Sequence, residues 1–86
     1  MSFWFQEPDA LSPGASITIE YWLVGGTDRG SQVGTPVPYL SANEDVFATG
    51  QGQRYDHATG KFIYSVTFKN LGAETAAFQT RGGGLT

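Results

Sequence analysis

The chain contains no cysteine among its 86 residues. This absence excludes a disulfide framework, and it also excludes thiolate metal sites and cysteine nucleophiles. Charged residues make up only 15% of the chain, against roughly a quarter in an average soluble domain. The five lysines and arginines leave a formal net charge of −3. Because proteins that bind phosphate backbones carry a basic patch, we expect no nucleic-acid partner.

The sequence also lacks long apolar runs. No run approaches the ~20 residues of a membrane-spanning helix, so no membrane span is predicted. Met1 is not followed by the charged and apolar segments of a secretory signal, which makes a cytoplasmic protein the default expectation. Export by a route that uses no signal is the alternative. The length fits one domain, predicted over residues 1–86 with residues 82–86 as a flexible tail.

Aromatic residues are abundant, at 14%, and together with the low net charge they predict a folded chain. Apolar and polar residues alternate clearly in two segments, which is typical of strands with one buried face. The apolar face of 16–24 comprises Ile17, Ile19, Tyr21 and Leu23. The apolar face of 61–70 comprises Phe62, Tyr64, Val66 and Phe68.

Shorter strands are predicted over 3–5, 37–42, 45–55 and 75–80, with glycine, proline and asparagine turns between them. Gly50 and Gly52 indicate a bulge or bend within the third of these segments. Helical periodicity is absent. About six short strands with such turns predict an all-β fold, a small antiparallel β-sandwich of immunoglobulin-like or jelly-roll-like type.

Two segments resemble motifs of a known family. Leu11 to Thr18 is similar to the strand opening L-x-P-G-x-S-x-T of bacterial immunoglobulin-like and adhesion-type β-sandwich modules. Tyr64 to Gly72 is similar to the strand and turn V-x-V-x-N-x-G of the same modules. The resemblance implies a binding or structural module. It implies no catalytic residues, because the family shares none.

The placement of the two tryptophans is the most unusual feature of the sequence. If Ile17 and Ile19 face the core, alternation puts Trp22 on the opposite face, and Trp4 is placed outward in the same way. Exposed tryptophans indicate a sugar-stacking platform, a subunit interface or another partner site. A second sheet that covers them is the remaining explanation. Small chains without disulfides or metals are often stabilised by oligomerisation, which favours the interface.

These observations predict a non-enzymatic, lectin-like binding module that forms a homo-oligomer and binds carbohydrate. Sugars stack on aromatic rings while planar polar side chains bind their hydroxyl groups. Residues of these types give the candidate ligand-binding set Trp22, Trp4, Tyr39, Arg54, Tyr55, Asp56 and Asp28. The alternative is a structural or assembly protein whose aromatic face meets another protein.

No catalytic residue, cofactor or metal is predicted. His57 follows Asp56, so a small hydrolase is a third hypothesis, but Asp56 to Gly60 is typical of a hairpin loop. Asn43, Glu44 and Asp45 offer oxygen ligands for calcium, yet they lack EF-hand spacing and fit a solvated turn. The glycine-rich segment 25–35 lacks a phosphate-binding motif, and its length is typical of a functional or mobile loop.

Overall fold

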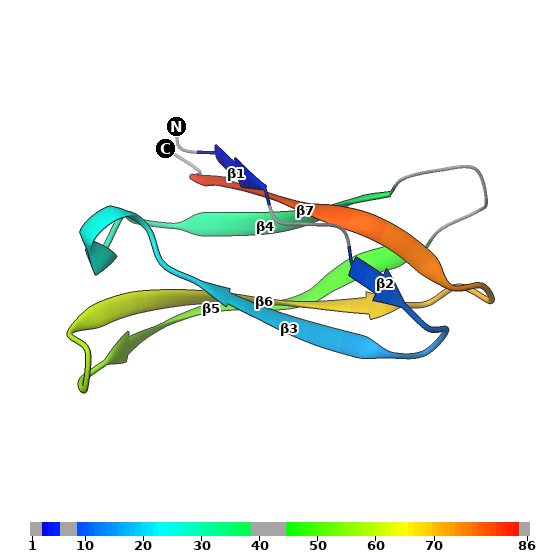
Figure 1. Cartoon of the computed structure of the whole chain (residues 1–86), viewed down its shortest axis with the longest axis horizontal. Coiled ribbons are helices and arrows are strands. Elements are labelled where there is room, and N and C mark those ends of the chain that lie inside the picture. Colours follow the sequence, from blue (N-terminus) through cyan, green and yellow to red (C-terminus); the bar gives the residue numbers. More distant parts are fainter. Residues whose placement is uncertain (1–2, 6–8, 39–44, 85–86) are drawn as a thin grey trace.

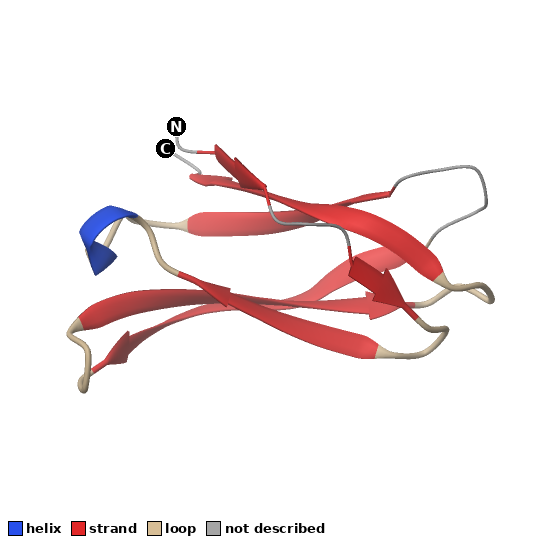
Figure 2. Cartoon of the chain, viewed as in Figure 1, coloured by secondary structure: helices blue, strands red, loops and turns tan. Residues whose placement is uncertain are grey.

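The structure, a computed structural model, describes residues 3–5, 9–38 and 45–84. Its strands are β1 (Phe3–Phe5), β2 (Asp9–Leu11), β3 (Ser16–Tyr21), β4 (Gln32–Pro38), β5 (Val46–Asp56), β6 (Lys61–Asn70) and β7 (Ala76–Gly84). A single 3₁₀ turn, η1, spans Val24–Gly26. The strands form two antiparallel sheets that face each other (Figures 1 and 2), so the predicted all-β sandwich is confirmed. No helix within the described ranges has the length and apolarity that a membrane crossing needs.

Each sheet is built around one central strand. In the β7 sheet, β4 pairs along residues 78–84, while β1 and β2 pair with residues 81–83 and 76–78. Because Phe78 and Gly83 each have a partner in β4 as well as one in β2 or β1, those two short strands lie along the other edge of β7. In the β6 sheet the order is β3-β6-β5.

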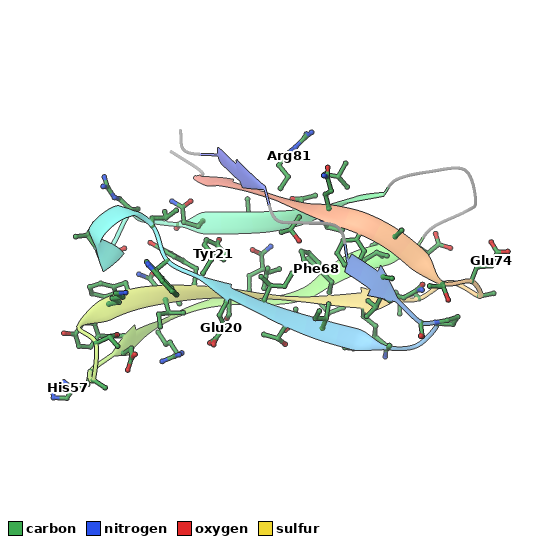
Figure 3. All side chains as sticks on the ribbon, viewed as in Figure 1. Glu20, Tyr21, His57, Phe68, Glu74 and Arg81 are labelled. Carbon is green, nitrogen blue, oxygen red and sulfur yellow. The ribbon has the colours of Figure 1, made fainter. Side chains whose placement is uncertain are left out.

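The core lies between the two sheets, as the alternation predicts. Its buried residues are Leu11, Ile19, Val46, Val66, Phe68, Ala76 and Phe78. The rings of Phe68 and Phe78 meet edge to face at 5.4 Å between centroids, and thereby join the two central strands. Figure 3 shows Tyr21 and Phe68 between the sheets and Glu20 pointing away from the β7 sheet.

Asn70 fastens the turns at one end of the sandwich. It is fully buried, and its Nδ2 donates to the carbonyls of Leu11 and Glu74 at 2.9 and 2.8 Å. Its Oδ1 accepts the N–H of Gly72 at 2.9 Å. Gly14, whose φ of 78° suits glycine, donates its N–H to the Asn70 carbonyl. The side chain and backbone of one residue therefore hold both neighbouring turns.

Three sequence predictions are corrected by the structure. The strand expected over 16–24 ends at Tyr21, since Gly25 and Gly26 take positive φ and form η1. The strand expected over 37–42 is β4, which starts earlier at Gln32, and residues 39–42 lie outside the described ranges. Residues 82–84, expected within a flexible tail, belong to β7, because β1 and β4 pair with them from both sides. Residues 85–86 lie outside the described ranges.

Candidate functional site

The outward side of the β6 sheet carries an exposed tryptophan and its neighbours, which we call the Trp22 face. It comprises Glu20, Trp22, Arg54, Lys61 and Ile63. Trp22 follows β3 directly and is 55% exposed, so its predicted outward position is confirmed. The Nζ of Lys61 lies 4.3 Å from the centroid of the Trp22 ring. A cation at this distance from an indole face attracts it and restrains its orientation.

A second exposed pair lies beside this aromatic group. The Nε of Arg54 on β5 donates to Oε2 of Glu20 on β3 at 3.2 Å, across the central strand β6. Ile63 on β6 lies directly opposite Arg54, on the outward side of the strand, whereas the next residue, Tyr64, faces inward. Ile63 is nevertheless only 7% exposed. Tyr21 pairs with Tyr64 in antiparallel order, so the next residue after β3, Trp22, comes opposite Ile63. The face therefore has an apolar floor between an aromatic ring and an ion pair.

Asp56 stabilises the turn that follows β5. Its Oδ2 accepts the Thr59 hydroxyl at 2.7 Å, and its Oδ1 accepts the N–H of Ala58 at 3.3 Å. The pKa of Asp56 is lowered, first by the Thr59 hydrogen bond and further by the Ala58 N–H and nearby cations. Gly60, with φ of 71°, closes the hairpin through its N–H to the Asp56 carbonyl. This carboxylate therefore acts within its own turn.

Tyr55 lies on the other side of β5 from Arg54. It pairs with Phe62, and the two rings are 5.1 Å apart between centroids. Tyr55 is 53% exposed, and the ring of His57 meets its edge at 6.4 Å. Figure 3 shows His57 at the tip of the hairpin between β5 and β6. In the described part of the chain, no group of three His, Asp or Glu residues is placed to hold a metal ion.

Asp28 fastens the loop of residues 27–31 to the β6 sheet. Its Oδ1 accepts the N–H of Gly30 at 3.0 Å and Nε2 of Gln53 at 3.1 Å. The Tyr64 hydroxyl accepts the Arg29 N–H at 2.9 Å and lies 2.9 Å from the Gly30 carbonyl. The Gly30 N–H, followed by Gln53, lowers the pKa of Asp28. The glycine-rich loop is thus anchored by a buried tyrosine and a surface glutamine.

The structure consequently brings together three of the seven predicted site residues, Trp22, Arg54 and Asp56. Asp56 is opposite Lys61 at the edge of this face, although its carboxylate is hydrogen-bonded within its own turn. Asp28 serves its own turn, and Tyr55 lies on another face. Trp4 is opposite Gly82 in the β1–β7 register, but its side chain lies outside what the structure describes, as does all of Tyr39.

The acidic corner is only partly described. Asn43 and Glu44 lie outside the described ranges, whereas Asp45 is exposed and its carbonyl accepts the N–H of Leu71 at 2.8 Å. The Asp45 backbone therefore belongs to a turn contact between the start of β5 and the end of β6.

Sequence reasoning missed Glu20, Lys61 and Ile63 as members of the Trp22 face. They come from strands far apart in the chain, and only the pairing register brings them beside Trp22 and Arg54. It also missed the role of the Tyr64 hydroxyl. A tyrosine at an inward position was the available signal, because a buried tyrosine hydroxyl usually has a hydrogen-bond partner.

No protein-family model matches the chain, and no match is found among curated proteins or solved structures.

Proposed function

We propose that the chain is a non-enzymatic binding module that holds a carbohydrate on the Trp22 face. The observation that carries the proposal is the exposed indole of Trp22 beside the Arg54–Glu20 pair. The apolar face of a sugar ring stacks on an indole, and guanidinium and carboxylate groups bind its hydroxyls with both donors and acceptors. The buried side chain of Ile63 gives this surface a fixed base.

Lys61 determines which face of the Trp22 indole is available to the ligand. Its ammonium lies over one face of the ring, so the sugar is expected on the opposite face and at the ring edge. Restraint of the indole before binding reduces the side-chain entropy lost when the ligand stacks on it. Lys61 is itself confined, because a Cβ built at Gly26 would lie only 2.5 Å from its Cγ. The aromatic group is therefore preorganised by contacts from η1 and β6.

Part of the strand pairing is shared with immunoglobulin sandwiches, in which the second, fifth and fourth strands share one sheet and the third and sixth strands pair in the other. If β1 and β2 are counted as one first strand, β3-β6-β5 and β4-β7 follow that arrangement. The first strand departs from it, because the described residues of β1 and β2 pair with β7 and not with β3. Modules of this family bind or assemble rather than catalyse, which agrees with the proposed function.

A glycan array tests the proposal with matched variants. Wild type is expected to bind a carbohydrate, Trp22→Ala to lose that binding, and Phe47→Ala to keep it. Phe47 is a suitable control because it is 52% exposed and pairs with Lys69, at the other end of β6 from Lys61. At about 3.3 Å per residue the two lysines are separated by roughly 26 Å along the strand. Unchanged binding by folded Trp22→Ala, verified by circular dichroism, would reject the Trp22 face.

A second candidate function is assembly of identical copies through the same sheet. Phe47 lies in the β6 sheet and Trp22 directly follows its strand β3, both side chains are exposed, and aromatic side chains are enriched at interfaces. Sedimentation equilibrium distinguishes this function. A homo-oligomer that dissociates in both Trp22→Ala and Phe47→Ala would favour assembly, whereas a wild-type monomer at all concentrations would exclude it.

A further inference from the structure

A polar pocket lies on the other side of β5 from the Trp22 face. Its volume is about 190 Å³, and its lining residues are Ser31, Gln32, Gln51, Gly52, Gln53 and Tyr64. Gln51 and Gln53 pair with Val66 and Tyr64, whose side chains are buried between the sheets, whereas Arg54 is on the outward face. The pocket therefore opens where β5 and the start of β4 approach each other at the edge of the sandwich. Among the residues that the structure describes, those that line it carry no charge.

Two glutamine side chains are held in defined orientations at this edge. Oε1 of Gln51 accepts the N–H of Gly34 at 3.0 Å, so the Gln51 amide presents its NH₂ group as the remaining partner. Nε2 of Gln53 donates to Oδ1 of Asp28 at 3.1 Å, so the Gln53 amide presents its oxygen. In each case, one amide atom is hydrogen-bonded to the protein, and the other is available to a ligand. The pocket thus offers a donor and an acceptor from adjacent positions of β5.

The third glutamine has a buried acceptor without a partner. Nε2 of Gln32 donates to the Arg29 carbonyl at 3.2 Å, which orients the amide. Oε1 of Gln32 is buried and has no hydrogen-bond partner among the described residues. Buried polar atoms of proteins are nearly always hydrogen-bonded. Because this oxygen is not accessible to solvent, a molecule in the pocket does not reach it, and Gln32 contributes to the pocket wall through the rest of its side chain.

We propose that this pocket binds a single sugar residue, as a site separate from the Trp22 face. Hydroxyl groups both donate and accept, so they match the neighbouring NH₂ group of Gln51 and oxygen of Gln53. The lining residues carry no charge, and the Asp28 carboxylate, bonded to the lining residues Gln53 and Tyr64, disfavours an anionic ligand. The volume replaces several water molecules of roughly 30 Å³ each, which is the space of one ring rather than an extended chain. The proposal stands on the pocket alone and does not depend on binding by Trp22.

Nuclear magnetic resonance titration of the full chain tests this site. The probes are glucose, galactose, mannose and N-acetylglucosamine, each added to millimolar concentration. At least one is expected to shift the backbone amides of Ser31 and Gln32 and the side-chain amides of Gln51 and Gln53. Gln51→Glu keeps an oxygen that accepts the Gly34 N–H but removes the NH₂ donor, and it is expected to weaken that binding at least tenfold. If no probe shifts these amides, or if folded Gln51→Glu binds with wild-type affinity, the proposal is rejected.

Two further variants separate this site from the first one. Ser31→Ala alters an exposed lining residue and is expected to weaken binding severalfold while the fold is unchanged. Trp22→Ala is expected to leave the monosaccharide-induced shifts of the pocket intact. If the pocket shifts vanish in Trp22→Ala, there is one site and not two, which overturns the inference. Loss of array binding in Trp22→Ala with an unresponsive pocket would reject the pocket and keep the Trp22 face.

Discussion

Replacement of Asn70 by alanine is expected to cause the largest loss of stability of any single polar substitution near the turns. The side chain makes three hydrogen bonds to backbone groups of Leu11, Gly72 and Glu74, and the residue is fully buried. A net hydrogen bond contributes about 1 kcal/mol, and a buried group left without a partner costs about 1–3 kcal/mol. We therefore expect Asn70→Ala to lower the free energy of unfolding by about 3–5 kcal/mol.

A loss of this size is a large part of the total for a domain of this length, which is about 4–13 kcal/mol. Urea denaturation followed by circular dichroism measures it, with the slope m showing whether the denatured state has changed. Asn70→Asp is expected to be at least as destabilising, because a carboxylate oxygen replaces the NH₂ group that faces two carbonyls.

Thr80→Val is the matched control for burial alone. Thr80 is also fully buried, but its hydroxyl has no hydrogen-bond partner among the described residues, so its removal is expected to leave stability unchanged or to raise it. A loss below about 1 kcal/mol in Asn70→Ala, or a loss no larger than that of Thr80→Val, would refute the role given to Asn70.

Acid is expected to weaken the Asp28 loop. The folded pKa of Asp28 is lowered, chiefly by the Gly30 N–H, so its contribution to stability is present above the unfolded pKa of about 3.9 and is lost as pH falls through the folded pKa. The urea midpoint should fall more steeply below about pH 4 in wild type than in Asp28→Asn, and parallel curves would contradict this assignment. Gly34→Ala is expected to lower stability by about 1–3 kcal/mol, because its Cβ would lie 2.9 Å from Cγ1 of Val66. Thermal melts measure whether Gly34→Ala costs less stability when Val66 is already alanine. If Gly34→Ala lowers stability equally in the wild type and in Val66→Ala, a steric cause is excluded.

The strand faces could be predicted from the sequence because their period is two. Segments 16–21 and 61–70 show the expected alternation, except that Ile63 on the outward side is buried, and the bulge in β5 lies between Ala48 and Gly50. The ends of the strands could not be predicted as well from the sequence. Gly25 and Gly26 turn the chain before the alternation stops, and Pro36 is accommodated within β4 because that strand lies at a sheet edge.

The glycines of 82–84 gave no sign of a strand, because their side chains contribute neither apolar period nor β-propensity. Their structure comes from strands paired on both sides, which is a property of the fold and not of the segment. Conversely, the motif from Tyr64 to Gly72, which contains Asn70, was visible in the sequence. The backbone groups that the Asn70 side chain binds are up to 59 residues away in the chain, so its role was not visible.

The candidate site divides in the same way. Trp22 could be placed outward from alternation alone, but its neighbours Lys61 and Glu20 depend on the register of three strands. Asp28 and Asp56 were predicted to contact ligand because they are carboxylates in loops. Both instead accept N–H groups two residues further along their own turns, a pattern that aspartate commonly forms and that the sequence allowed.

The indole N–H of Trp22 gives the most direct measurement of the proposed carbohydrate site. The chain has two tryptophans, and comparison with the spectrum of Trp22→Ala assigns their two indole resonances. Titration with the glycan that binds best on the array should shift the Trp22 indole N–H and saturate in parallel with binding. A Trp22 indole resonance that stays fixed while the glycan saturates the protein would contradict carbohydrate binding on this face.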